Sequence, residues 1–161
     1  MTDIGAWKSD RVGAAERGEN PTVLARLRSG WAVIGDSQHL PGYCVLLFHN
    51  PQVDQLIQLP RADRAAFLFD LALLGEAVHT ACAQLDPDLD RINYEVLGNT
   101  LHQLHGHILA RYRWEPEEYR RGPVWLYPDR DDLAHQLSTR HDPLRAALTR
   151  ELARVTDQAY R

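Results

Sequence analysis

Residues 91–111 read RINYEVLGNTLHQLHGHILAR, and this stretch decides the fold. Two apolar runs flank Gly98 and Asn99, a pair of residues typical of a tight turn. The segment is therefore predicted to form two antiparallel strands, at 91–97 and 103–111.

The second predicted strand carries polar side chains on one face only. Residues two apart on a strand point to the same face of a sheet. Gln103, His105 and His107 are therefore predicted to project side by side, with Leu104 and Ile108 on the opposite face. Two imidazoles next to a glycine-containing turn favour a site for phosphate chemistry.

Length, composition and charge restrict the kinds of protein that this chain can be. A chain of 161 residues that is 44% hydrophobic can form one domain with its own core. The formal charge of −4 gives no global basic field, so we expect no nucleic-acid partner. Cys44 and Cys82 form no zinc motif or disulfide framework. The first residues lack the apolar core of a signal peptide and no run of 18 apolar residues occurs, so we expect a cytoplasmic protein without a membrane partner.

Strand and helix signals alternate along the rest of the chain. Asn20 and Pro21 predict a helix that runs to about Arg28. The other expected elements are strands at 31–34 and 43–48, a long helix at 61–85, an irregular segment at 114–130 that lies over the sheet, and a helix from 142 to about 160. The long helix has one apolar stripe, formed by Leu68, Leu71, Leu74, Val78 and Cys82. This order predicts an α+β fold.

The block from about Trp31 to Tyr112 resembles the histidine triad (HIT) superfamily of nucleotidyl hydrolases and transferases. Residues 103–109, QLHGHIL, match the family's His-x-His-x-His motif and the two apolar residues after it, with Gln103 at the first histidine position. Residues 93–101 resemble the matching segment of the branch that includes diadenosine tetraphosphate hydrolases. Residues 40–43, LPGY, resemble the Pro-Gly-His sequence at the start of a family strand.

The resemblance implies the architecture. It is that of a single HIT-like domain over residues 1–161, with an N-terminal arm at 1–20, the HIT core at 31–112 and a C-terminal extension with a helix at 113–161. The implied fold is an antiparallel sheet with one long helix packed on it, plus N- and C-terminal helices. The resemblance also implies a homodimer.

The resemblance further assigns roles by position. His105 matches the family's nucleophile, and His107 matches the histidine that contacts the phosphate. Asn99 and Thr100 match turn residues that donate to phosphate oxygens. Asp36 lies where the family often has an acid that binds ribose hydroxyls, although a simple turn residue is an equally good interpretation.

Three further interpretations concern residues around this motif. Gln103, which we include among the phosphate-binding residues, is interpreted chiefly as a residue that hydrogen-bonds His105 or the backbone. Arg111 shares the face of His105 and is the best candidate for a remote phosphate contact. The aromatic residues of the extension pack on the sheet, or one of them covers a nucleotide base: Trp114, Trp125 and Tyr127.

The chemistry of these residue types points to nucleotidyl transfer. A free imidazole with a pKa of about 6.5 is largely unprotonated near neutral pH and can attack an α-phosphorus. The expected function is a hydrolase of nucleoside phosphoanhydrides or phosphoramidates, such as dinucleoside polyphosphates. A nucleotide-binding protein with little or no turnover and a nucleotidyl transferase are the alternatives. No cofactor or metal is expected, because glutamine is a poor ligand and the sequence offers no obvious third ligand beside the two histidines.

Overall fold

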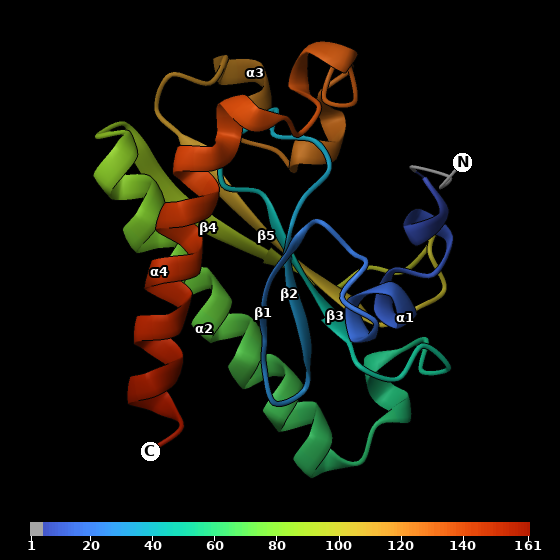
Figure 1. Ribbon diagram of the computed structural model, residues 1–161. Helices are drawn as coiled ribbons and strands as arrows, with labels where there is room; N and C mark the ends of the chain where they lie inside the picture. The colour runs from blue at the N-terminus through green and yellow to red at the C-terminus, as the bar shows by residue number, and fades with distance from the viewer. Residues whose placement is uncertain (1–4) are drawn as a thin grey trace.

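An antiparallel sheet lies at the centre of the computed structural model, which describes residues 5–161 (Figure 1). The strand order is β1-β2-β3-β5-β4, and every neighbouring pair is antiparallel. The strands are β1 (Val23–Arg26), β2 (Gly30–Ile34), β3 (Cys44–Phe48), β4 (Leu89–Glu95) and β5 (His105–Tyr112). The strand pair predicted from residues 91–111 is confirmed as β4 and β5, and it forms one side of the sheet.

Two long helices cover one face of this sheet. In Figure 1, α2 and α4 lie side by side on that face, while α1 lies near β3 on the opposite side. The helices are α1 (Arg11–Glu16), α2 (Arg61–Leu85), α3 (Glu117–Arg120) and α4 (Asp142–Ala159), with 3-10 turns at Ala6–Ser9, Leu56–Gln58, Val124–Leu126, Leu133–His135 and Thr139–His141. The predicted α+β fold, with a long helix on the sheet and a C-terminal helix, is confirmed.

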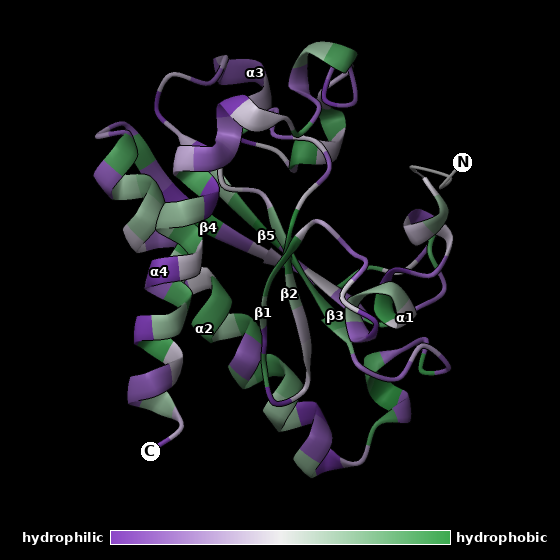
Figure 2. Ribbon diagram, in the orientation of Figure 1, coloured by the Kyte–Doolittle hydropathy of each residue, from purple (hydrophilic) through white to green (hydrophobic). Residues whose placement is uncertain are grey.

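The main core lies between the helices and the sheet. Helix α4 alternates hydrophobic and hydrophilic residues along its length, as a helix with one buried face should (Figure 2). The inward residues of α2 include Phe67, Leu71, Leu74 and Val78. Leu68 was predicted to belong to this stripe, but it is 42% exposed. Successive helical residues are rotated by about 100°, which turns Leu68 away from the core and Phe67 into it.

Helix α2 is long and apolar enough to cross a membrane by length and composition alone. In the fold, 56% of its most apolar window is buried. It packs on β3, β4 and β5 and against α4. We therefore interpret it as the core helix of the domain.

The helix predicted from Asn20 to about Arg28 is wrong, because this segment contains strand β1. The side chain of Asn20 accepts hydrogen bonds from the backbone N–H and the hydroxyl of Thr22, at 3.0 and 2.6 Å, and so forms a turn instead of a helix cap. The N–H of Leu27 donates to the carbonyl of Gly30 at 2.8 Å and closes a hairpin with β2. Pairing along β2 overrides the local helix signal.

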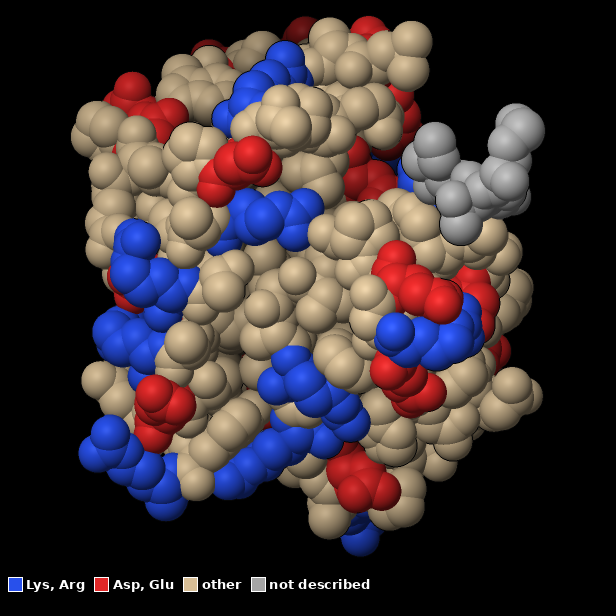
Figure 3. Space-filling view, viewed as in Figure 1, with Lys and Arg blue, Asp and Glu red and all other residues tan. Residues whose placement is uncertain are grey.

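The terminal segments hold more regular structure than expected. Within the predicted arm at 1–20, residues 5–20 include a 3-10 turn and α1, whose first turn is capped by Asp10; residues 1–4 lie outside the described part. Residues 114–130 are mostly irregular, as predicted, apart from α3 and one 3-10 turn. On the face shown in Figure 3, basic and acidic side chains are interspersed.

Candidate functional site

The alternation predicted for β5 is present. Leu104 and Ile108 are buried in the core under the helices, and a Cβ atom added to Gly106 would lie 2.6 Å from a methyl group of Leu71 on α2. His105 and His107 therefore project from the opposite face of the sheet. Each is only 8% exposed, so both imidazoles sit in a recessed position.

A cavity of about 960 Å³ opens on this second face. Both histidines line it, and so do three of the other predicted site residues, Asn99, Thr100 and Asp36. This volume lies within the usual range for small-molecule sites. Residues far apart in the sequence are thus brought together as the motif predicted.

The ring of His105 is held in one orientation by the backbone. Its Nδ1 lies 2.6 Å from the carbonyl oxygen of Gln103. A carbonyl can only accept, so the proton resides on Nδ1 and the lone pair of a neutral ring resides on Nε2. The side-chain Nε2 of Gln103 is buried and has no hydrogen-bond partner within residues 5–161. The contact with His105 therefore comes from the Gln103 main chain and not, as predicted, from its side chain. Gln103 is also not among the described residues that line the cavity, so the predicted phosphate contact of its side chain is not present.

The second histidine has a different environment. Its ring centroid is 4.7 Å from that of His105, with the planes at 78°, and its Nδ1 lies 2.8 Å from the hydroxyl of Tyr43. Burial, together with the nearby His105 and Arg130, lowers the pKa of His107 to about 4. His107 is therefore neutral at pH 7.

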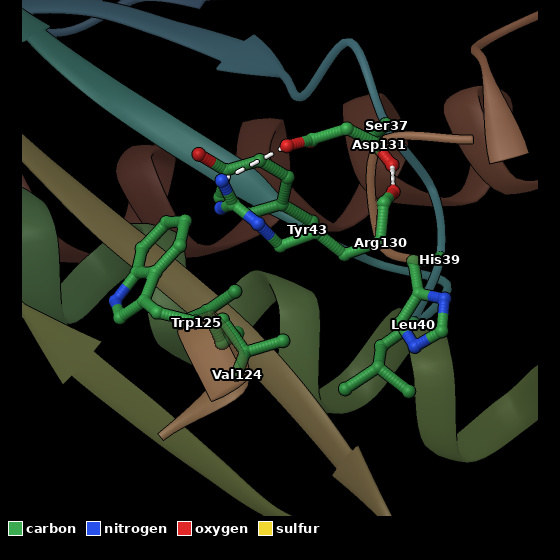
Figure 4. A pocket seen from close by; sticks show the side chains of 9 residues that line it. Ser37, His39, Leu40, Tyr43, Val124, Trp125, Arg130 and Asp131 are labelled. Atoms are coloured by element: carbon green, nitrogen blue, oxygen red, sulfur yellow. Dashed lines mark hydrogen bonds and ion pairs between the residues drawn. The ribbon is translucent and has the colours of Figure 1, made fainter. Parts of the chain in front are cut away.

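The C-terminal extension supplies a wall of the cavity. Trp125 contacts His107 at a centroid distance of 5.0 Å, and its Nε1 donates to the carboxylate of Glu95 on β4. The guanidinium of Arg130 lies 4.6 Å from the Trp125 ring centroid. Figure 4 shows Arg130 extending beside Tyr43, in a small pocket next to the main cavity. Trp125 thus packs over the sheet and also borders the ligand space.

Polar residues of two loops complete the rim. Both carboxylate oxygens of Asp36 accept from Arg11, at 3.2 and 2.6 Å. Asn99 and Thr100 lie on the exposed turn that follows Gly98, whose φ of 105° favours glycine. The backbone of this turn can approach a ligand closely because Gly98 has no side chain.

The predicted phosphate contact of Arg111 is wrong. Arg111 is 3% exposed and is not among the described residues that line the cavity. Its Nε and Nη2 donate to Glu115, and its Nη1 donates to the Asn93 side chain and to the carbonyl of Gly122. A guanidinium with its donors occupied in this way anchors the extension to the sheet.

The two other aromatic candidates are structural. Tyr127 is buried and donates to Glu115 at 2.7 Å. Trp114 stacks on Tyr112 at a centroid distance of 4.9 Å. Neither is among the described residues that line the cavity.

Three residues border the cavity although the sequence did not predict a role for them: Tyr43, Arg11 and Arg130. Tyr43 had a signal, because residues 40–43 resemble the Pro-Gly-His sequence of the HIT superfamily, with tyrosine at the place of the histidine. Arg11 and Arg130 had no such signal, because no periodic pattern in their segments predicts where their side chains lie.

Comparison with known proteins supports the fold. No protein-family model matches the sequence, and no curated protein matches it either. A histidine triad protein from Sinorhizobium meliloti 1021 superimposes with a TM-score of 0.67 at 22% identity, over 84% of this chain and 93% of that one. A histidine triad protein from Marinobacter aquaeolei VT8 gives 0.63 at 22% identity, over 84% and 88%. A hypothetical histidine triad nucleotide-binding protein from Sulfolobus tokodaii strain 7 gives 0.64 at 10% identity, over 90% and 92%. The chain therefore has the HIT fold.

Proposed function

We propose that this protein is a nucleotidyl hydrolase of the diadenosine tetraphosphate hydrolase-like type, acting on nucleoside phosphoanhydrides or phosphoramidates. The observation that carries the proposal is the hydrogen bond from Nδ1 of His105 to the Gln103 carbonyl at 2.6 Å. This contact leaves the other ring nitrogen free for attack, on a side chain that lines a nucleotide-sized cavity.

The reaction consists of two displacements at the α-phosphorus. In the first, the Nε2 lone pair of His105 forms a P–N bond while the bond from phosphorus to the leaving group breaks. The leaving group departs with the bonding electrons, a phosphate as its anion and the amine of a phosphoramidate after it takes up a proton from water. In the second, a water oxygen attacks the same phosphorus, the P–N bond breaks, and the water proton is released. His105 is thereby regenerated with its Nδ1 proton in place.

His107 is proposed to stabilise charge on the phosphate. Burial raises the pKa of the Tyr43 phenol, so its proton is retained and can be donated to Nδ1 of a neutral His107. The remaining proton of His107 then lies on Nε2 and can be donated to a phosphate oxygen. Asn99 and Thr100 supply further donors from the turn, and one such donor is typically worth about 100- to 1000-fold in rate.

The rest of the cavity suits a nucleoside. Trp125 offers an aromatic face for a base, and the carboxylate of Asp36 can accept from ribose hydroxyls. Arg11 and Arg130 lie at the rim, where each is paired with a carboxylate, Asp36 at 2.6 Å and Asp131 at 2.9 Å. Additional phosphates of a polyphosphate substrate would bind these guanidinium groups by competing with the two carboxylates.

The test is incubation with a panel of adenosine and guanosine polyphosphates, dinucleoside tetraphosphates and adenosine phosphoramidate in ¹⁸O-labelled water. The proposal expects the label in the nucleoside monophosphate, together with a phosphoramidate adduct on His105 that survives alkali and is lost in acid. Label found only in the other product would contradict attack at the α-phosphorus.

The same experiment separates the alternatives. Nucleotides that bind and remain intact after prolonged incubation would identify a binding protein. Turnover that requires a second phosphate compound as acceptor would identify a transferase.

We also propose that the protein forms a homodimer. β4 is one of the two edge strands of the sheet, and Tyr94 on this strand is half exposed. An exposed edge of this kind is a suitable surface for pairing with a second copy. Light scattering during size-exclusion chromatography should give twice the mass of the chain; a single-chain mass at micromolar concentration would contradict the proposal.

A further inference from the structure

His39, in the loop between β2 and β3, has an unusual environment. Both ring nitrogens are shielded from solvent, and neither has a hydrogen-bond partner in the part of the chain that the structure describes. The ring packs edge-on against Tyr127 at a centroid distance of 4.4 Å, which holds it in place. Buried polar atoms normally have partners, so this imidazole has capacity for a ligand.

Two other metal-ligating side chains meet His39 at this position. The ring of His135 lies 4.6 Å away by centroids, at 87°, and its Nε2 is 3.9 Å from a carboxylate oxygen of Asp129. One ligand atom from each of the three side chains lies within 4.8 Å of the others. These residues come from two segments about 90 positions apart, so the fold itself creates the cluster.

We propose that His39, Asp129 and His135 form a binding site for a transition metal ion of the Zn²⁺ class. Two imidazoles and one carboxylate are a donor set that Zn²⁺ accepts, with the fourth position taken by water. Calcium and magnesium ions prefer all-oxygen ligands and fit this set poorly.

The geometry needs only a small adjustment to hold such an ion. With metal–ligand bonds of about 2.0–2.1 Å, tetrahedral ligand atoms lie roughly 3.4 Å apart. The three ligand atoms lie within 4.8 Å of one another, so they must approach by up to about 1.4 Å. Asp129 is exposed and can change its side-chain rotamer to close this gap.

The position of this site suggests what the ion would do. The segment that carries Asp129 and His135 is already joined to the β2–β3 loop, because the Gln38 N–H donates to the His135 carbonyl at 2.7 Å and the Leu137 N–H donates to the Asp36 carbonyl at 2.8 Å. Between the two ligands lies Arg130, which borders the main cavity. A bound ion would therefore fix this wall of the cavity and stabilise the fold. This role is independent of the proposed hydrolysis.

The test measures metal binding by the full chain after treatment with a chelator. Titration with Zn²⁺ should give one ion per chain and raise the melting temperature. Titration with Co²⁺ should give the intense visible absorption of a four-coordinate ion. The variants His39→Gln, His135→Gln and Asp129→Asn should each weaken Zn²⁺ binding by at least about tenfold. The control is His49→Gln, an exposed histidine just after β3, which should bind as the unmodified chain does.

Asp129→Asn also distinguishes loss of a ligand from loss of the fold, and one further variant distinguishes this site from the main cavity. Asp129→Asn changes an exposed side chain, so its circular dichroism spectrum and melting temperature without metal should match those of the unmodified chain. The double variant His105→Ala/His107→Ala should retain the ion. Loss of binding in that double variant, undiminished binding in His39→Gln and Asp129→Asn, or no binding by the unmodified chain below millimolar Zn²⁺ would each overturn the proposal.

Discussion

The two faces of β5 show how one strand serves stability and chemistry at once. On the helix side, Leu104 and Ile108 are packed into the main core, and Gly106 has no space for even a methyl group. On the other side, His105 and His107 border an open cavity. Alternation with a period of two keeps the polar groups out of the core and the apolar groups out of the site. Substitutions on the two faces should therefore have separable effects.

The largest effect is expected on the cavity face, at the proposed nucleophile. His105→Ala should lower kcat/KM by about 10⁴-fold or more, because no neighbouring group can replace the attacking nitrogen. His102→Ala is the matched control, since its side chain is 75% exposed. Steady-state kinetics and thermal unfolding of both variants check this, and turnover within tenfold of the unmodified protein in His105→Ala would refute the assigned role.

The next effect is expected on the helix face. Ile108→Ala removes a fully buried side chain and should lower the free energy of unfolding by about 2–5 kcal/mol. Asn99→Ala, on the exposed turn of the cavity face, should change it by less than about 0.5 kcal/mol while lowering kcat by about 100-fold. Urea denaturation and kinetics measure both. Equal losses in the free energy of unfolding of the two variants would contradict the conclusion that the helix face serves stability and the cavity face serves catalysis.

Acid should weaken the fold through His107. The unfolded chain binds a proton at this imidazole near pH 6.5, whereas the folded chain does so only near its pKa of about 4. The free energy of unfolding should therefore fall as pH drops from 6.5 to 4, by about 3 kcal/mol in total.

The pH dependence is checked by chemical denaturation across that window. His107→Gln should show a flatter curve than the unmodified protein. An unchanged slope in His107→Gln would mean that this imidazole titrates normally in the folded state.

The smallest effect is expected at Gln103. Gln103→Ala keeps the carbonyl that orients His105 but removes the buried amide, so kcat should fall by only about tenfold. Gln103→His tests whether glutamine at this position suits the reaction or limits its rate. A rise in rate would indicate that glutamine at this position limits turnover, and no rise would indicate that it suits the reaction.

Much of the fold and part of the site could be predicted from short-range patterns. The turn at Gly98 and the alternation on β5 correctly gave the strand pair and the shared face of the two histidines. Helix α2 followed from its apolar period, and only the first residue of the predicted stripe was wrong, because Phe67 is buried instead of Leu68.

The errors arise where distant partners decide the structure. Asn20 and Pro21 carry a real helix signal, but pairing of β1 with β2 outweighs it. By strand alternation, Arg111 should share the face of the two histidines. Its guanidinium instead binds Glu115, four residues further along the chain, and nearby backbone carbonyls. The approach of His39 to His135 depends on the path of a long irregular segment, which no periodicity encodes.

The contact of Trp125 with His107 has a practical consequence for spectroscopy. An indole beside a titrating imidazole and a neighbouring guanidinium is sensitive to protonation and to any aromatic group that enters the cavity. Intrinsic fluorescence should consequently report occupancy without a label, and the difference between the unmodified protein and Trp125→Phe would isolate that emission from the signals of Trp7, Trp31 and Trp114.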